Sequence, residues 1–151
     1  MGLFDFFKSP PLLHDPFFGP LRFQKGTQHS TSYFEGTGLF APTGQTIEYF
    51  VDAEEDGPSE DQRAFYRRLQ TDFGKHLVRI EPLIVDEFRK WRPDFAIQDF
   101  TQEFTLLAVT IPQLDTSPVE WNLSFSTVHD LDHDITIYFQ DQQPIHILID
   151  G

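Results

Sequence analysis

The sequence predicts an α+β fold, in which an antiparallel sheet carries two central helices on one of its faces. Three observations support this prediction. Short strand-like segments come first, a helical stripe of apolar residues occupies the middle, and four alternating segments end the chain. Strands and helices segregated along a chain in this way are typical of an antiparallel sheet with helices packed on one side. A length of 151 residues suits one domain.

The first residues predict a tail rather than a part of the domain. Residues 1–16 are rich in Phe and Leu, but Pro10 and Pro11 prevent a helix from continuing through them. We therefore expect a flexible N-terminal tail over residues 1–16 and a single α+β domain over residues 17–151. The alternative is that the Phe-rich tail docks on its own domain or on another chain.

Three short strands are expected before the helices. Phe17 to Phe23 predicts the first, and Tyr33 to Phe40 the second, with Gly36 and Gly38 indicating a bulge or a sharp bend. Gln45 to Asp52 alternates between apolar and polar residues, which predicts a half-buried strand.

The middle of the chain predicts two helices. Ser59 and Gln62 form a capping-box pattern, which marks the start of the first. Apolar residues then follow at helical spacing. They are Phe65, Leu69, Phe73, Leu77, Ile80, Ile84, Phe88 and Trp91. Pro82 falls inside this stripe, so a kink or a fresh helix near Glu81 is expected. Pro93 helps to end the second helix.

A four-strand antiparallel meander is predicted to follow. Its strands are expected at Glu103 to Ile111, Val119 to Thr127, Asp134 to Gln140 and Ile145 to Ile149, with a short hairpin loop before the last. The face of this sheet that lies away from the helices carries polar side chains and is expected to be open to solvent or to a partner.

The densest group of ligand-type side chains lies just before the third meander strand. His129, Asp130, Asp132 and His133 carry the imidazole and carboxylate groups that bind zinc, manganese or iron. Two interpretations stay open. A hydrated turn between strands is favoured, because Asp suits turns and no second ligand cluster is evident. The other interpretation is a divalent metal site, which His146 on the neighbouring strand could approach.

Composition limits the function classes. The formal net charge of −13 repels phosphate backbones and anionic membranes, so neither nucleic acid nor membrane is expected as a partner. The absence of Cys excludes disulfides, thiolate nucleophiles and Cys-ligated metal centres. The N-terminal segment lacks a basic region, and no apolar run approaches the ~20 residues that span a bilayer. A cytoplasmic protein is therefore expected.

Two segments carry a resemblance to a known family. The first is Y-F-E-G at Tyr33 to Gly36, followed by an alternating strand and the D-G-P-S-E-D-Q helix start; the second is V-H-D-L-D-H-D at Val128 to Asp134. Together they resemble a family of uncharacterised bacterial domains, small acidic α+β proteins, over roughly Phe17 to Gly151. The chain departs from the family where Tyr33 or Phe34 replaces a Trp and where Asp141-Gln142 replaces Asp-Gly.

The resemblance implies a role in binding rather than an activity. Some similar small acidic domains act as immunity proteins that neutralise toxins. The acidic charge, the richness in Phe and the lack of a catalytic set make the leading hypothesis a non-catalytic protein-binding module, toxin-neutralising or accessory, with a basic protein partner and no cofactor. One alternative is a metal-binding protein or metal-dependent hydrolase that uses the cluster from His129 to His133. Another is a homo-oligomeric structural domain that pairs through an edge strand or the open sheet face.

Overall fold

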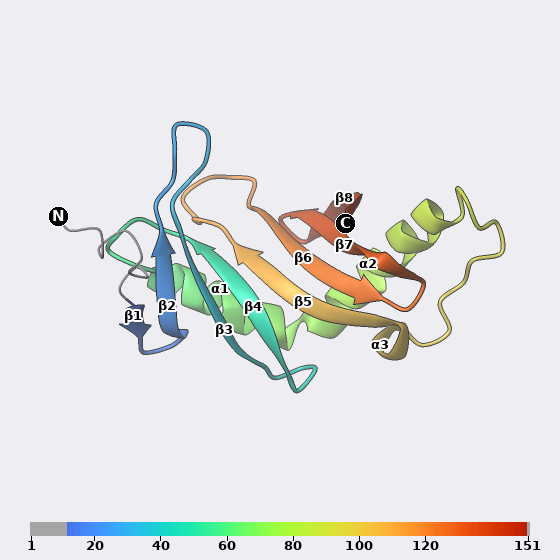
Figure 1. Cartoon of the computed structure of the whole chain (residues 1–151), viewed down its shortest axis with the longest axis horizontal. Helices are drawn as coiled ribbons and strands as arrows, with labels where there is room; N and C mark the ends of the chain where they lie inside the picture. Colours follow the sequence, from blue (N-terminus) through green and yellow to red (C-terminus); the bar gives the residue numbers. More distant parts are fainter. Residues whose placement is uncertain (1–11, 151) are drawn as a thin grey trace, which may run out of the picture.

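All eight strands of the described chain form one sheet, and their order in the sheet is their order in the sequence (Figure 1). The computed structural model describes residues 12–150. The strands are β1 (Leu12–Asp15), β2 (Gly19–Gln24), β3 (Tyr33–Phe40), β4 (Gln45–Asp52), β5 (Phe104–Ile111), β6 (Glu120–Thr127), β7 (Asp130–Gln140) and β8 (Gln143–Asp150). The helices are α1 (Glu60–Thr71), α2 (Phe73–Phe88) and α3 (Phe100–Glu103).

The sheet consists of two antiparallel meanders joined by one parallel pairing. The first meander is β1 to β4 and the second is β5 to β8. Between them, β4 and β5 run parallel, from Glu48 opposite Ala108 to Val51 opposite Ile111. The prediction of a wholly antiparallel sheet is wrong at this pairing. Parallel neighbours need a long crossover connection, and here it contains α1 and α2.

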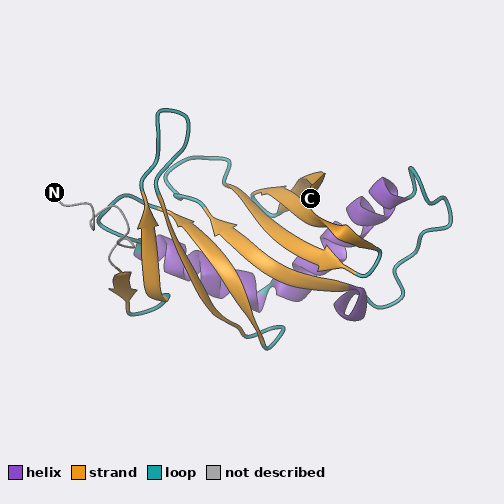
Figure 2. Ribbon diagram, viewed as in Figure 1, coloured by secondary structure: helices purple, strands orange, loops and turns teal. Residues whose placement is uncertain are grey.

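The helices follow the sequence pattern closely. Both long helices lie on the same face of the sheet, as expected (Figure 2). The capping box at Ser59 and Gln62 is present and starts α1. Helix α2 runs unbroken through Pro82, so no fresh helix begins near Glu81. It ends at Phe88, which leaves Trp91 outside the helix although the apolar stripe placed it within.

The core lies between the sheet and the two long helices and is rich in aromatic rings. Alternating residues of the second meander point into it: Ile135 and Ile137 of β7 are fully buried, and Ile149 and Ile147 lie opposite them on β8. Trp121 and Phe139 stack with their centroids 4.1 Å apart. The four predicted strands of the meander are therefore present, although β7 and β8 begin earlier than the alternation indicated, at Asp130 and Gln143.

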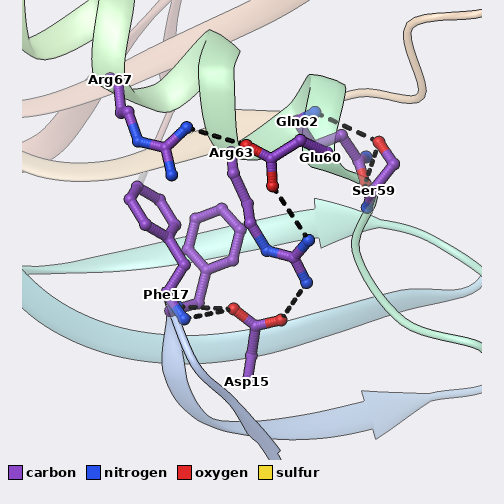
Figure 3. Close-up of polar contacts among 8 residues, drawn as sticks. Asp15, Phe17, Ser59, Glu60, Gln62, Arg63 and Arg67 are labelled. Atoms are coloured by element: carbon purple, nitrogen blue, oxygen red, sulfur yellow. Dashed lines mark hydrogen bonds and ion pairs between the residues drawn. The ribbon is translucent and has the colours of Figure 1, made fainter.

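The domain begins earlier than the sequence indicates. The predicted tail of residues 1–16 falls outside the described residues up to position 11, but Leu12–Asp15 form strand β1 and pair with β2. Asp15 is only 6% exposed. Its carboxylate accepts hydrogen bonds from the backbone N–H groups of Phe17 and Phe18, at 2.9 and 2.7 Å, and from Arg63 Nη2 at 2.6 Å (Figure 3). These bonds tie β1 to helix α1.

Candidate functional site

The predicted ligand cluster lies at the β6–β7 turn. Strand β6 ends at Thr127 and β7 begins at Asp130, so only Val128 and His129 stand between the strands. The favoured interpretation, a turn over the whole cluster, is wrong from Asp130 onward because β7 starts four residues before the expected Asp134.

An irregular pairing exposes part of this strand. Thr127 pairs with Asp130 and Phe125 with Ile135, so the residues from Leu131 to Asp134 lie opposite Ser126 alone. A bulge of this kind bends the strand and redirects its side chains. Leu131 is 87% exposed as a result.

His129 forms the first of two acid–base pairs. Its Nε2 lies 2.6 Å from Glu103 Oε1. The ring packs between aromatic side chains, with its centroid 4.8 Å from that of Phe95 and 5.9 Å from that of Phe104. The backbone N–H of Asp99, followed by the His129 ring, lowers the pKa of Glu103. These contacts fix the imidazole of His129 in one orientation.

His133 forms the second pair, at the surface. Its Nδ1 lies 2.9 Å from Asp130 Oδ2. The hydrogen bond to Asp130 raises the pKa of His133, and the same bond lowers the pKa of Asp130. Each member thus favours the charged form of the other.

The four predicted metal ligands therefore divide into separate contacts. His129 turns to Glu103 and His133 turns to Asp130, while Asp132 donates its backbone N–H to Asp130 Oδ1 at 3.1 Å. Within residues 12–150, no group of three or more His, Asp or Glu side chains is arranged to hold a metal ion. His146 lies across from Tyr138 on β7 rather than beside the cluster. Metal binding stays a prediction.

The same residues form one wall of a cleft. We call it the Trp91–Leu131 cleft. It has a volume of about 460 Å³ and is lined by Phe88, Trp91, Arg92, His129, Asp130, Leu131 and Asp132. Trp91 is 55% exposed, and its ring rests edge-on against buried Phe88 at 5.5 Å. Arg92 Nη2 donates to the backbone carbonyl of His129 at 2.9 Å, which joins the two walls.

A second concavity lies toward the opposite end of the molecule, where the chain passes from β4 into α1 (Figure 1). We call it the acidic pocket. It has a volume of about 390 Å³, and its lining includes the carboxylates of Asp52, Glu54, Asp56, Asp61 and Asp115 but no basic side chain. Burial raises the pKa of Asp52. Asp61 also lies in the first turn of α1, where its charge suits the helix dipole.

The sequence located the turn but did not place Trp91 in the cleft or pair Glu103 with His129. Trp91 was assigned to the buried stripe because it follows Phe88 at helical spacing. Pro93 was used to end the helix, but a proline restricts only the residue before it, so it does not place the helix end at Phe88. Glu103 was assigned to the start of a strand, and nothing in the local sequence connects it to His129, which lies 26 residues later.

Comparison with protein-family models, curated proteins and solved structures gives no match for this chain. Among the described residues, none of the helices combines the length and the apolar character that crossing a membrane requires.

Proposed function

We propose that the chain is a non-catalytic protein-binding module that engages a basic partner through the Trp91–Leu131 cleft. The observation that carries the proposal is a pair of large, exposed apolar side chains, Trp91 and Leu131, in the lining of one cleft, with carboxylates beside them. The proposal includes the α+β class, a cytoplasmic setting and a toxin-neutralising or accessory role.

Trp91 has the properties of a binding anchor. Interface residues whose truncation weakens binding most are enriched in Trp, Tyr and Arg. Trp91 offers more than half of its surface to solvent, yet its ring is supported by Phe88. Arg92 beside it is held by the His129 carbonyl. A supported ring loses little conformational freedom on binding, which favours affinity.

Leu131 is the second exposed apolar side chain in the cleft lining. The bulge in β7 holds this side chain away from the core. An apolar group of a partner that enters the cleft would cover Trp91 and Leu131 together. Removing both surfaces from water contributes roughly 25 cal/mol per Å² of apolar area.

The charges around the cleft favour a basic partner. Asp130 and Asp132 line it, and the whole chain carries a formal charge of −13. Complementary charge speeds encounter and excludes partners of like charge. A partner segment with an apolar residue next to Lys or Arg fits both features.

The acid–base groups of the cleft support a binding role. His129 is engaged by Glu103, and His133 is engaged by Asp130. What the cleft presents outward is then the exposed side chains of Trp91 and Leu131 together with the charged groups that line it. This arrangement suits recognition of a side chain better than proton transfer to a substrate.

The test begins with capture of a partner from a lysate of the host at low salt, followed by titration of that purified partner against variants. Trp91→Ala is expected to weaken binding about thirtyfold, as for an interface anchor. Val78→Ala is the matched control, since Val78 is an exposed apolar residue of α2 outside the cleft. It should bind as the unaltered chain does.

Three results would count against the proposal: no stoichiometric partner, an acidic partner, or a Trp91→Ala variant that binds normally. Thermal melting of each variant checks that its fold is intact. Binding is also expected to persist in EDTA. Loss of binding on chelation would instead favour the metal-binding alternative at His129, Asp130, Asp132 and His133.

A further inference from the structure

Strand β8 is an edge of the sheet in the described part of the chain, because it pairs with β7 alone. Its outer backbone groups are therefore available to another strand. Asp150 is its only formally charged residue at neutral pH, and Leu148 is 40% exposed. A long, apolar edge of this kind is a site at which strands of another chain add.

Only the second half of β8 is regular enough for pairing. Pro144 lacks a backbone N–H, and the register with β7 shifts at Ile145. Proline and irregular pairing are devices that protect an edge from addition of strands. From His146 to Asp150 the pairing with β7 is continuous and contains neither device.

Two acidic residues face each other at the end of this segment. Asp134 on β7 lies directly opposite Asp150 on β8. Like charges in directly opposed positions destabilise a sheet. Within the described residues, neither carboxylate forms an ion pair. A cation placed beside Asp150 would relieve the repulsion.

We propose that β8 pairs antiparallel with β8 of a second copy of this chain, around a two-fold axis at Leu148. In that register Leu148 faces Leu148 of the second copy. Ile147 faces Ile149 of the second copy, and His146 faces Asp150 of the second copy. The two-fold axis repeats the His146–Asp150 contact, so each Asp134–Asp150 pair receives one imidazole.

The geometry of antiparallel strands selects this register. In an antiparallel pair, two directly opposed residues either both direct their backbone N–H and C=O groups toward the other strand or both direct them away from it. A two-fold axis between two copies of one strand must therefore pass through a residue and not between two residues. Moving the axis to Ile147 places Asp150 opposite Pro144. A parallel arrangement places Asp150 opposite Asp150. The axis at Leu148 alone among these puts an imidazole opposite the carboxylate.

Successive side chains of β8 lie on opposite faces of the sheet, as pairing with another strand requires. His146, Leu148 and Asp150 alternate with Ile147 and Ile149, which pack against the core. On its own chain, His146 faces Tyr138, with Thr136 and Gln140 on either side of it along β7. Asp150 faces Asp134, and its charge also acts on His133. From α2, Arg79 donates to the carbonyl of Gln142.

Charge also selects the edge over other surfaces for self-association. Two copies of −13 repel one another, and the repulsion is weakest where charges are few. Dimerisation through β8 is therefore expected to strengthen at high salt. Binding of a basic partner in the Trp91–Leu131 cleft is expected to weaken at high salt. Dimerisation through β8 and partner binding in the cleft can therefore be disproved independently.

Sedimentation equilibrium of the full chain tests the dimer over a concentration series at low and at high salt, and association is expected to be stronger at high salt. Leu148→Lys is expected to weaken association more than about tenfold, because two like charges would meet at the axis. Leu39→Lys, at an exposed leucine of β3 in the first meander, should leave it unchanged.

A charge exchange tests the register. His146→Asp alone should weaken association, because it opposes two carboxylates. Combining His146→Asp with Asp150→His should restore association. The proposal is overturned if the unaltered chain stays monomeric throughout. It is equally overturned if Leu148→Lys associates normally, or if the exchange restores nothing while thermal melting shows folded protein.

Discussion

The first meander contains the buried carboxylate of Asp15, the second packs against the buried imidazole of His76, and the two groups are held in opposite ways. In the first meander, Asp15 is buried as a charged group. Burial raises its pKa, but hydrogen bonds from Arg63, Phe18 and Phe17 outweigh this effect, and the pKa lies below its usual value. The carboxylate is therefore stabilised in its ionised form.

The second meander packs against a neutral group. His76 of α2 is 2% exposed, and its ring meets Trp121 and Phe139 edge-on at 5.1 and 5.5 Å. Its Nδ1 has no hydrogen-bond partner among the described residues. Burial, followed by the charge of Arg79, lowers the pKa of His76. The imidazole is therefore favoured in its uncharged form.

The difference shows that burial alone does not decide protonation. Asp15 keeps its charge because three donors replace the water it has lost. His76 is surrounded by aromatic rings that cannot replace water, so the proton is disfavoured. The first meander should therefore depend on one ion pair, whereas the second should depend on packing around a neutral ring.

The largest effect is expected from breaking that ion pair. Arg63→Ala leaves the Asp15 carboxylate buried without its cation, which should lower the free energy of unfolding by about 3 kcal/mol. Urea unfolding at neutral pH measures the loss. Because the lowered pKa of Asp15 contributes stability above its unfolded value of about 3.9, the loss should shrink as the pH falls below about 4.

Arg67→Ala provides the matched control for this substitution. Arg67 lies one turn along the same helix and pairs with the exposed Glu60 at 3.0 Å. Exposed pairs contribute little, so this variant should lose far less stability than Arg63→Ala. Equal losses in the two variants would show that the Asp15–Arg63 contact does not hold β1 to α1.

The next effect concerns the junction between the meanders. Gln62 is 2% exposed, and its Nε2 donates to the carbonyls of Asp52 and Pro112, at 2.7 and 2.9 Å. These carbonyls lie just where β4 and β5 end. Gln62→Ala leaves both without this donor and should lower the free energy of unfolding by about 2 kcal/mol. Chemical denaturation monitored by circular dichroism measures the change.

Gln70→Ala serves as the control in the same helix, since Gln70 accepts one exposed hydrogen bond from Ala41. It should lose much less stability than Gln62→Ala. Gln62→Glu sharpens the comparison, because it keeps the acceptor for the N–H of Ser59 but loses the donor to both carbonyls. If Gln62→Glu is as stable as the unaltered chain, the junction does not depend on these two bonds.

Local patterns in the sequence were sufficient to predict most of the elements. The capping box located the start of α1, and alternation located the four strands of the second meander, because each pattern lies within one segment. The parallel pairing of β4 with β5 was missed because it joins residues about 60 positions apart. Strand β1 was missed for a similar reason, since it depends on Asp15 meeting Arg63 across 48 residues.

The candidate site shows the same limit. Residue types identified His129 and its neighbours as a group of interest, but their partners come from elsewhere. Glu103 reaches His129 from the end of α3, and Trp91 reaches the cleft from beyond α2. Spacing along the chain predicts which side chains share a face of one element. It does not predict which elements meet at their ends.

The smallest expected effect tests the neutral group of the second meander. The unfolded chain binds a proton at His76 near pH 6.5, whereas the folded chain resists it, so stability should fall as the pH drops below about 6.5. His76→Phe keeps an aromatic ring against Trp121 and removes the titration. Thermal unfolding between about pH 5 and pH 8 should therefore show a flatter pH dependence in this variant. His29→Phe, at an exposed histidine of the β2–β3 loop, should keep the original slope. An unchanged slope in His76→Phe would mean that His76 is protonated equally in the folded and unfolded chain, and the contrast between the two meanders would then be lost.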